Sequence, residues 1–168
     1  MRQRVRRHPL PCTSRFGNHL LGVPPGSCRS RSMNAVAESR VEQGQYGRVF
    51  ALRVRPNEDL VASLRTLVAT QGLRHAVIKG AVGSLIDGNL AFGPAATATT
   101  VHIPGPGVEI LSINGDIRVG DDGQANVRVQ GTLGGLDGKV YAGTFVPGGN
   151  LAFITMEVVV QEWVPSAA

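Results

Sequence analysis

One segment with helical periodicity stands in a chain whose other periodic segments alternate apolar and polar residues, and this contrast limits the possible folds. Asn57 is a candidate N-cap residue, and Gly72 supplies a candidate C-terminal stop. The apolar residues between them recur at the spacing of one helix face, which predicts an amphipathic helix over residues 58–71. The residues on that face are Leu60, Val61, Leu64, Leu67 and Val68.

Short strands are predicted on both sides of this helix. Runs that are alternating or continuously apolar are bounded by Gly, Pro, Asn and Asp, which favour turns. In the first of these strands we expect Val49, Ala51 and Leu52 to face the core. One main helix packed on a mostly antiparallel sheet makes an α+β domain. The predicted strands are 46–54, 75–82, 89–92, 108–113, 115–119, 125–133, 139–145 and 151–163.

The charge is divided unevenly along the chain. Residues 1–33 contain seven arginines and no Asp or Glu, whereas residues 34–168 contain ten basic and twelve acidic residues, a net charge of −2. We therefore predict a basic disordered tail over residues 1–45 and a nearly neutral domain over residues 46–165. An alternative for the tail is that translation begins at Met33; a transit peptide fits less well, because prolines interrupt the helix that it needs.

The positions of the cysteines and the length of the apolar runs indicate the cellular location of the protein. Both cysteines, Cys12 and Cys28, lie in the tail, so the predicted domain has no thiol. This fits a reducing cytoplasm, which is the location we expect. No apolar run approaches the roughly 20 residues that a membrane-spanning helix requires, so we expect no membrane partner.

Three segments resemble the signature of a known family. They read Glu109-Ile-Leu-Ser-Ile-Asn-Gly115, Arg128-Val-Gln-Gly-Thr-Leu133 and Ala142-Gly-Thr144-Phe145. Over about residues 46–164 the chain resembles the plants-and-prokaryotes-conserved (PPC) domain. The resemblance implies the PPC fold, assembly into a homotrimer, and a site near the contacts between subunits. PPC domains occur beside AT-hooks in plant nuclear proteins, so the resemblance also implies association with DNA.

The chain departs from this signature where many prokaryotic members carry three histidines suited to a metal ion. Arg128, Gln130 and Thr144 stand at those positions. An arginine guanidinium is always protonated and repels a cation, and a threonine hydroxyl is a weak ligand. We therefore expect no metal at this site and no other cofactor.

The same three side chains suit a small anion. Arg128 and Gln130 are two residues apart on a predicted strand, so they point to the same face. A guanidinium binds a carboxylate or phosphate through two parallel hydrogen bonds, and Gln130 and Thr144 add neutral hydrogen bonds. We predict a ligand-binding site at these residues.

Two further residues are candidates for this ligand-binding site. His102 precedes the loop of residues 104–107, whose Gly and Pro residues are typical of loops that line sites. Glu109 opens the first of the three segments that resemble the family signature. The alternative for Arg128 is an ion pair with Glu109 or Glu157 instead of a ligand.

DNA is the other candidate partner. In the tail, Arg2, Arg4, Arg6 and Arg7 form a basic cluster that suits contacts with phosphates. This cluster lacks the Gly between arginines that an AT-hook carries in its core. The slightly acidic domain by itself is a poor surface for nucleic acid, because phosphate backbones require a clustered basic face.

These observations favour a non-enzymatic protein that is associated with DNA or with regulation and acts as a homotrimer. The alternative is a protein or enzyme that binds a small anionic ligand at the subunit junction around Arg128. No catalytic residue is assigned, because neither Ser84 nor Ser112 lies in a Gly-x-Ser-x-Gly turn.

Overall fold

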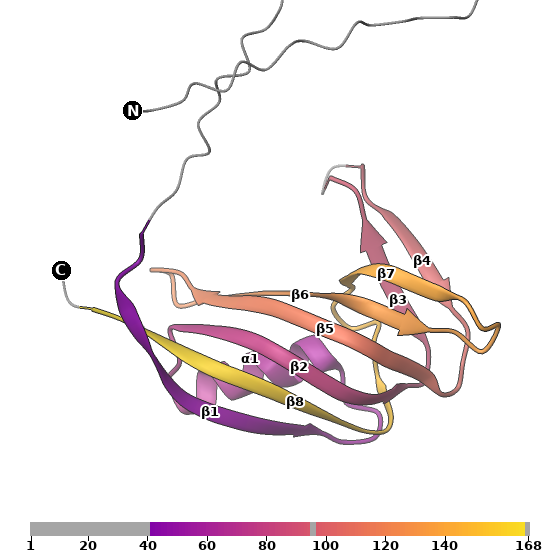
Figure 1. Cartoon of the computed structure of the whole chain (residues 1–168), viewed down its shortest axis with the longest axis horizontal. Coiled ribbons are helices and arrows are strands. Elements are labelled where there is room, and N and C mark those ends of the chain that lie inside the picture. Colours follow the sequence, from indigo (N-terminus) through magenta and orange to yellow (C-terminus); the bar gives the residue numbers. More distant parts are fainter. Residues whose placement is uncertain (1–40, 95–96, 167–168) are drawn as a thin grey trace, which may run out of the picture. The chain divides into compact units, whose positions relative to one another are not determined.

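The fold is one antiparallel sheet with a single helix on one face, seen in a computed structural model that describes residues 41–94 and 97–166. The eight strands are ordered β1-β8-β2-β5-β6-β7-β3-β4 (Figure 1). This architecture confirms the predicted α+β class. The elements are β1 (Gly44–Val54), α1 (Leu60–Gln71), β2 (His75–Leu85), β3 (Gly88–Phe92), β4 (Thr99–Ile103), β5 (Val108–Val119), β6 (Ala125–Gly134), β7 (Val140–Phe145) and β8 (Ala152–Pro165).

Predictions that concern residues 1–40 lie outside the described residues. These are the basic tail, its arginines Arg2, Arg4, Arg6 and Arg7, and the start at Met33. The compact unit of the described chain begins at Val41. Within the described residues, no helix combines the length and the apolar character that crossing a membrane requires.

The N-cap of helix α1 lies two residues later than predicted. Asp59 is the N-cap, and its Oδ1 accepts a hydrogen bond from the Ala62 backbone N–H at 3.0 Å. The predicted cap, Asn57, lies instead in the preceding turn with φ 66° and donates its N–H to the Ala152 carbonyl at 2.9 Å. The prediction of Gly72 as the stop is confirmed, because it ends α1 in the left-handed conformation.

The core lies between α1 and the sheet face that α1 covers. The buried side of the helix packs against apolar side chains of the central strands, and the two sets form one cluster. We call the opposite face of the sheet the open face. The buried helix residues are Leu60, Val61, Leu64 and Val68, and buried sheet residues of the cluster include Ala76, Ile78, Ile117, Val129, Val158 and Val160.

The prediction for the inward face of β1 was only partly right, because Leu52 alone of its three residues packs against the core. Val49 is 62% exposed and lies on the open face with Ala51, whereas Phe50 is half-buried and Val54 is fully buried against the core. The pairing of β1 with β8 shifts register between Tyr46 and Val49. An irregularity of this kind changes which alternate residues face the core, and it leaves little trace in the apolar pattern.

Two further differences concern β5 and β4. The strands predicted at 108–113 and 115–119 are one continuous strand, β5, which passes through Gly115. A side chain at Gly115 would collide with the Arg128 carbonyl oxygen, so glycine permits close approach here and does not end the strand. The edge strand β4 was not predicted, and it contains His102.

Candidate functional site

Arg128 and Gln130 lie on the open face because they alternate along β6 with side chains of the core. Val129 is 1% exposed, and Val127 packs against the core from the same side. Pairing across the sheet brings Thr144 of β7 opposite Gln130, as the resemblance to the family led us to expect. The three side chains predicted to bind a ligand therefore lie on adjacent strands of one face.

A hollow of about 450 Å³ lies over these strands. Arg128, Gln130 and Thr144 all line it, together with residues of β3 and β5, and we call it the Arg128 hollow. The guanidinium of Arg128 is its one charged group. The other lining residues are Ala91, Phe92, Gly93, Ser112, Asn114, Gly131, Thr132, Ala142 and Gly143.

Three polar residues of this hollow were not predicted. Ser112 and Asn114 come from β5, and Thr132 continues the row of Arg128 and Gln130 on β6. The Ser112 Oγ and Thr132 Oγ1 atoms lie 2.8 Å apart and share a hydrogen bond. The period-two spacing of polar residues on both strands is the sequence signal that points to them.

The other two predicted site residues lie outside the Arg128 hollow. His102 is on the edge strand β4, and its Nδ1 lies 3.1 Å from the Asn89 Oδ1. Glu109 is at the far end of β5, opposite Ser84 and Gly134. Neither is among the lining residues, so the single chain does not bring them together with Arg128.

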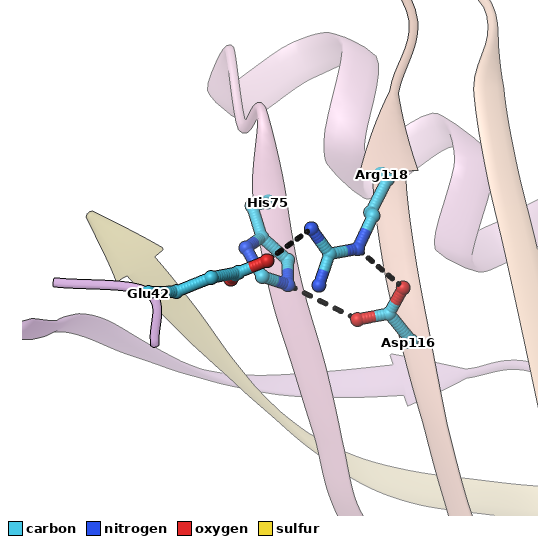
Figure 2. Close-up of polar contacts among 4 residues, drawn as sticks. All are labelled: Glu42, His75, Asp116 and Arg118. Carbon is cyan, nitrogen blue, oxygen red and sulfur yellow. Dashed lines mark hydrogen bonds and ion pairs between the residues drawn. The ribbon is translucent and has the colours of Figure 1, made fainter. Parts of the chain in front are cut away.

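Four polar side chains on β2, on β5 and just before β1 form a network of hydrogen bonds and ion pairs (Figure 2). His75 Nε2 lies 3.0 Å from Asp116 Oδ1, and Arg118 Nε donates to Asp116 Oδ2 at 3.0 Å. Arg118 Nη1 also bonds Glu42 Oε1 at 3.3 Å, which ties the segment before β1 to β5. The side chain of His75 is only 13% exposed.

These contacts raise the pKa of Arg118 and engage the carboxylate of Asp116, which lies opposite Arg128. Partial desolvation lowers the pKa of Arg118, but the carboxylates of Asp116 and Glu42 outweigh it, so the pKa of Arg118 is raised and its charge is secure. Asp116 is the residue directly opposite Arg128 on β5. The carboxylate oxygens of Asp116 bond His75 and Arg118. Among the described residues, no ion pair joins Asp116 to Arg128.

No ion pair involving Arg128 is found among the described residues. Glu157, one of its two alternative partners, pairs with Arg53 of β1. Glu109, the other, lies beyond the hollow. Arg128 thus presents a positive charge without a carboxylate partner in the part of the chain that the structure describes.

The arrangement can bind a charged molecule. Within residues 41–94 and 97–166, no three side chains of His, Cys, Asp or Glu gather as metal ligands would. The Ser112 hydroxyl is bonded to another hydroxyl, not to a base that would activate it. One guanidinium surrounded by amides and hydroxyls is a set of groups that binds an anion.

The sequence matches a known protein family. The family model of the Plants and Prokaryotes Conserved (PCC) domain matches residues 41–164. The chain belongs to this family. PCC and PPC are two abbreviations of the same family description. A search of curated proteins finds no match.

Solved structures share the PPC fold with this chain. A metal-containing protein from Archaeoglobus fulgidus is 24% identical with a TM-score of 0.66, and covers 77% of this chain and 89% of its own. A PPC protein from Pyrococcus horikoshii is 20% identical with a TM-score of 0.65, and covers 77% and 87%. A proposed DNA-binding protein from Bacteroides thetaiotaomicron is 17% identical with a TM-score of 0.60, and covers 71% and 84%.

Proposed function

We propose that this PPC domain is a non-enzymatic binding protein that holds a small anion in the Arg128 hollow. The observation that carries the proposal is the exposed guanidinium of Arg128, which lines the hollow while the carboxylate opposite it is bonded elsewhere. A carboxylate or phosphate would receive two hydrogen bonds from Arg128. Gln130 and Thr144 would add neutral hydrogen bonds from the neighbouring positions.

The strength of this interaction depends on how far the hollow excludes water. A hydrogen bond to a charged group contributes about 1.5–3 kcal/mol in a partly dry site and less in an open one. Arg128 is exposed in the single chain. We therefore expect weak binding by one chain, and tighter binding if a second subunit covers the hollow, because desolvation strengthens the ion pair.

A thermal-shift experiment tests the proposal. The full chain is heated with malate, 3-phosphoglycerate or inorganic phosphate, and a ligand that binds the folded state raises Tm by an amount that grows with the logarithm of its concentration above Kd. The shift should disappear in Arg128→Ala and persist in Arg55→Ala, which removes an exposed arginine outside the hollow. A shift that survives Arg128→Ala, or no shift with any of these anions, would exclude this function.

We also propose that the chain acts as a homotrimer. Support comes from the family and from apolar side chains on the open face that a single chain leaves uncovered: Val49 is 62%, Val82 67% and Val159 41% exposed. Light scattering on a size-exclusion column should give three times the 17.7 kDa mass of the chain. A mass of one chain at micromolar concentration would contradict this assembly.

Association with DNA is the second candidate function. It is favoured by the seven arginines of residues 1–33 and by relatives described as proposed DNA-binding proteins. Fluorescence anisotropy of a labelled duplex should show binding by residues 1–168 that high salt abolishes, and none by residues 34–168. Equal binding by the shorter chain would locate the contact in the domain, and binding by neither would remove this candidate.

A further inference from the structure

A second hollow, larger than the first, lies where the β5–β6 hairpin extends past the end of α1. Its volume is about 760 Å³, within the range of about 300–1,000 Å³ that is usual for small-molecule sites. It is lined by the last turns of α1, the segment that leads into β2, and the hairpin. These residues are Arg65, Val68, Ala69, Gly72, Leu73, Arg74, Val119, Gly123, Gln124 and Ala125. We call it the hairpin hollow.

The floor of the hairpin hollow is apolar. Val68 and Leu73 belong to the core and are 3% and 2% exposed, and Val119 and Ala125 pack against the same core from the hairpin. A ligand would place an apolar body against the half-buried Val119 and Ala125, and removing apolar surface, chiefly its own, from water contributes roughly 25 cal/mol per Å². The floor therefore selects for a molecule that is not uniformly polar.

The wall of the hairpin hollow is positively charged. Arg65 of α1 and Arg74, just before β2, both line it, and among the described residues neither guanidinium forms an ion pair or a hydrogen bond. The C-terminal end of α1 carries a partial negative charge of about half an elementary charge, which opposes an anion. Two full positive charges exceed it, and the N–H groups of Gly72 and Leu73 are already bonded to the Val68 carbonyl.

We propose that the hairpin hollow binds an organic carboxylate with an apolar body, such as a medium-chain alkyl or aromatic acid. The guanidiniums of Arg65 and Arg74 hold the carboxylate, and Val119 and Ala125 contact the apolar part. This site is separate from the Arg128 hollow, with which it shares no lining residue. It therefore does not depend on the function proposed above.

Displacement of a fluorescent probe tests this proposal on the full chain. Anilinonaphthalene sulfonate is itself an apolar anion whose fluorescence rises in an apolar site. We expect decanoate and 1-naphthoate to displace it. Decanol and decylammonium, which match decanoate in length but are neutral and cationic, should displace it at least about tenfold more weakly, because they forgo the charge-assisted hydrogen bonds. Displacement by all three decyl compounds at similar concentrations would overturn the proposal.

Variants locate the site. Arg65→Gln and Arg74→Gln, which keep most of the side-chain volume, should each weaken decanoate binding about tenfold. Ala69→Trp, at an exposed helix position, should fill the hollow and abolish binding. Arg55→Ala, which removes an exposed arginine outside both hollows, is the matched control and should leave binding unchanged. Binding that is unaffected by all three changes in the hollow, or that is lost in Arg55→Ala, would contradict a site at the hairpin.

Discussion

Asp116 lies directly opposite Arg128 across β5 and β6, yet its carboxylate oxygens bond His75 Nε2 and Arg118 Nε, each at 3.0 Å. The residue best placed to neutralise Arg128 is thus occupied by other partners. His75 can hold one oxygen of Asp116 because its own ring is packed against Trp163, with 6.4 Å between the ring centroids. The contacts of Asp116 outside the hollow therefore leave the guanidinium of Arg128 without a carboxylate partner among the described residues.

We predict that Asp116→Asn increases the affinity of the Arg128 hollow for anions. The change removes a negative charge close to the bound anion, a repulsion of roughly 0.6 kcal/mol at about 7 Å in water, or about threefold in Kd. Titration calorimetry with malate and inorganic phosphate at low salt measures the effect. Asp121→Asn, in the turn at the tip of the β5–β6 hairpin, is the control and should change Kd less. Weaker binding by Asp116→Asn would instead mean that Asp116 positions Arg128.

Local patterns were sufficient to predict most of the fold. The helix stripe from Leu60 to Val68 and the alternation along β6 each depend on neighbours in sequence, so both could be predicted. The N-cap could not, because Asp59 also accepts the Asn150 N–H through its Oδ2 at 3.1 Å, a contact with a distant loop. The register shift in β1 and the edge strand β4 likewise follow from pairing with strands far along the chain.

The candidate site, like the fold, could be predicted only in part from the sequence. The gathering of Arg128, Gln130 and Thr144 could be predicted from period-two spacing on one strand and from the resemblance to the family. The bond between His75 and Asp116 could not, because the two residues are 41 positions apart and meet only through the register of β2 with β5. For His102 and Glu109, composition of the neighbouring segment pointed to a site, but the strand positions place both outside the hollow.

Asn150 is predicted to be essential for stability. It is fully buried, its Oδ1 accepts the Asn89 N–H at 2.9 Å, and its Nδ2 donates to the carbonyls of Asn89 at 3.0 Å and Val146 at 2.8 Å. Asn150→Ala removes three hydrogen bonds and leaves the buried Asn89 N–H without this acceptor, although the two carbonyls keep the N–H groups of Val146 and Gly149. At about 1 kcal/mol for each bond, we expect the free energy of unfolding to fall by about 3 kcal/mol. Urea denaturation measures it, with Asn126→Ala, at an exposed position, as the control. A loss below about 1 kcal/mol would show that water replaces the amide.

Asp59→Ala should lower the free energy of unfolding by about 1–2 kcal/mol. The carboxylate caps α1 through Ala62 and also holds the Asn150 N–H, so the change removes two hydrogen bonds. Asp59→Asn retains one acceptor oxygen and should recover part of the loss. Asn57→Ala is an informative comparison, because the structure assigns no cap to that residue. If Asn57→Ala removed more helix signal by circular dichroism than Asp59→Ala, the cap would be assigned incorrectly.

The last prediction concerns pH. The pKa of Asp137 is lowered from 3.8 to about 2, first by the hydrogen bond from the Lys139 side chain and then by that from the Tyr141 hydroxyl. These bonds measure 2.9 Å and 2.8 Å. Because the pKa is lower in the folded state, Asp137 stabilises the fold fully above pH 4 and loses this contribution as the pH falls from about 4 towards 2.

NMR titration of the Asp137 carboxyl carbon should therefore give a midpoint near 2 in the unchanged chain. Lys139→Met removes the largest cause and should move the midpoint towards 3.8, and Tyr141→Phe should move it by a smaller amount. Lys79→Met, which removes a lysine that lies over the Tyr46 ring, should leave it in place. A midpoint near 3.8 in the unchanged chain would mean that solvent breaks the contacts among these exposed side chains, as it often does for surface ion pairs.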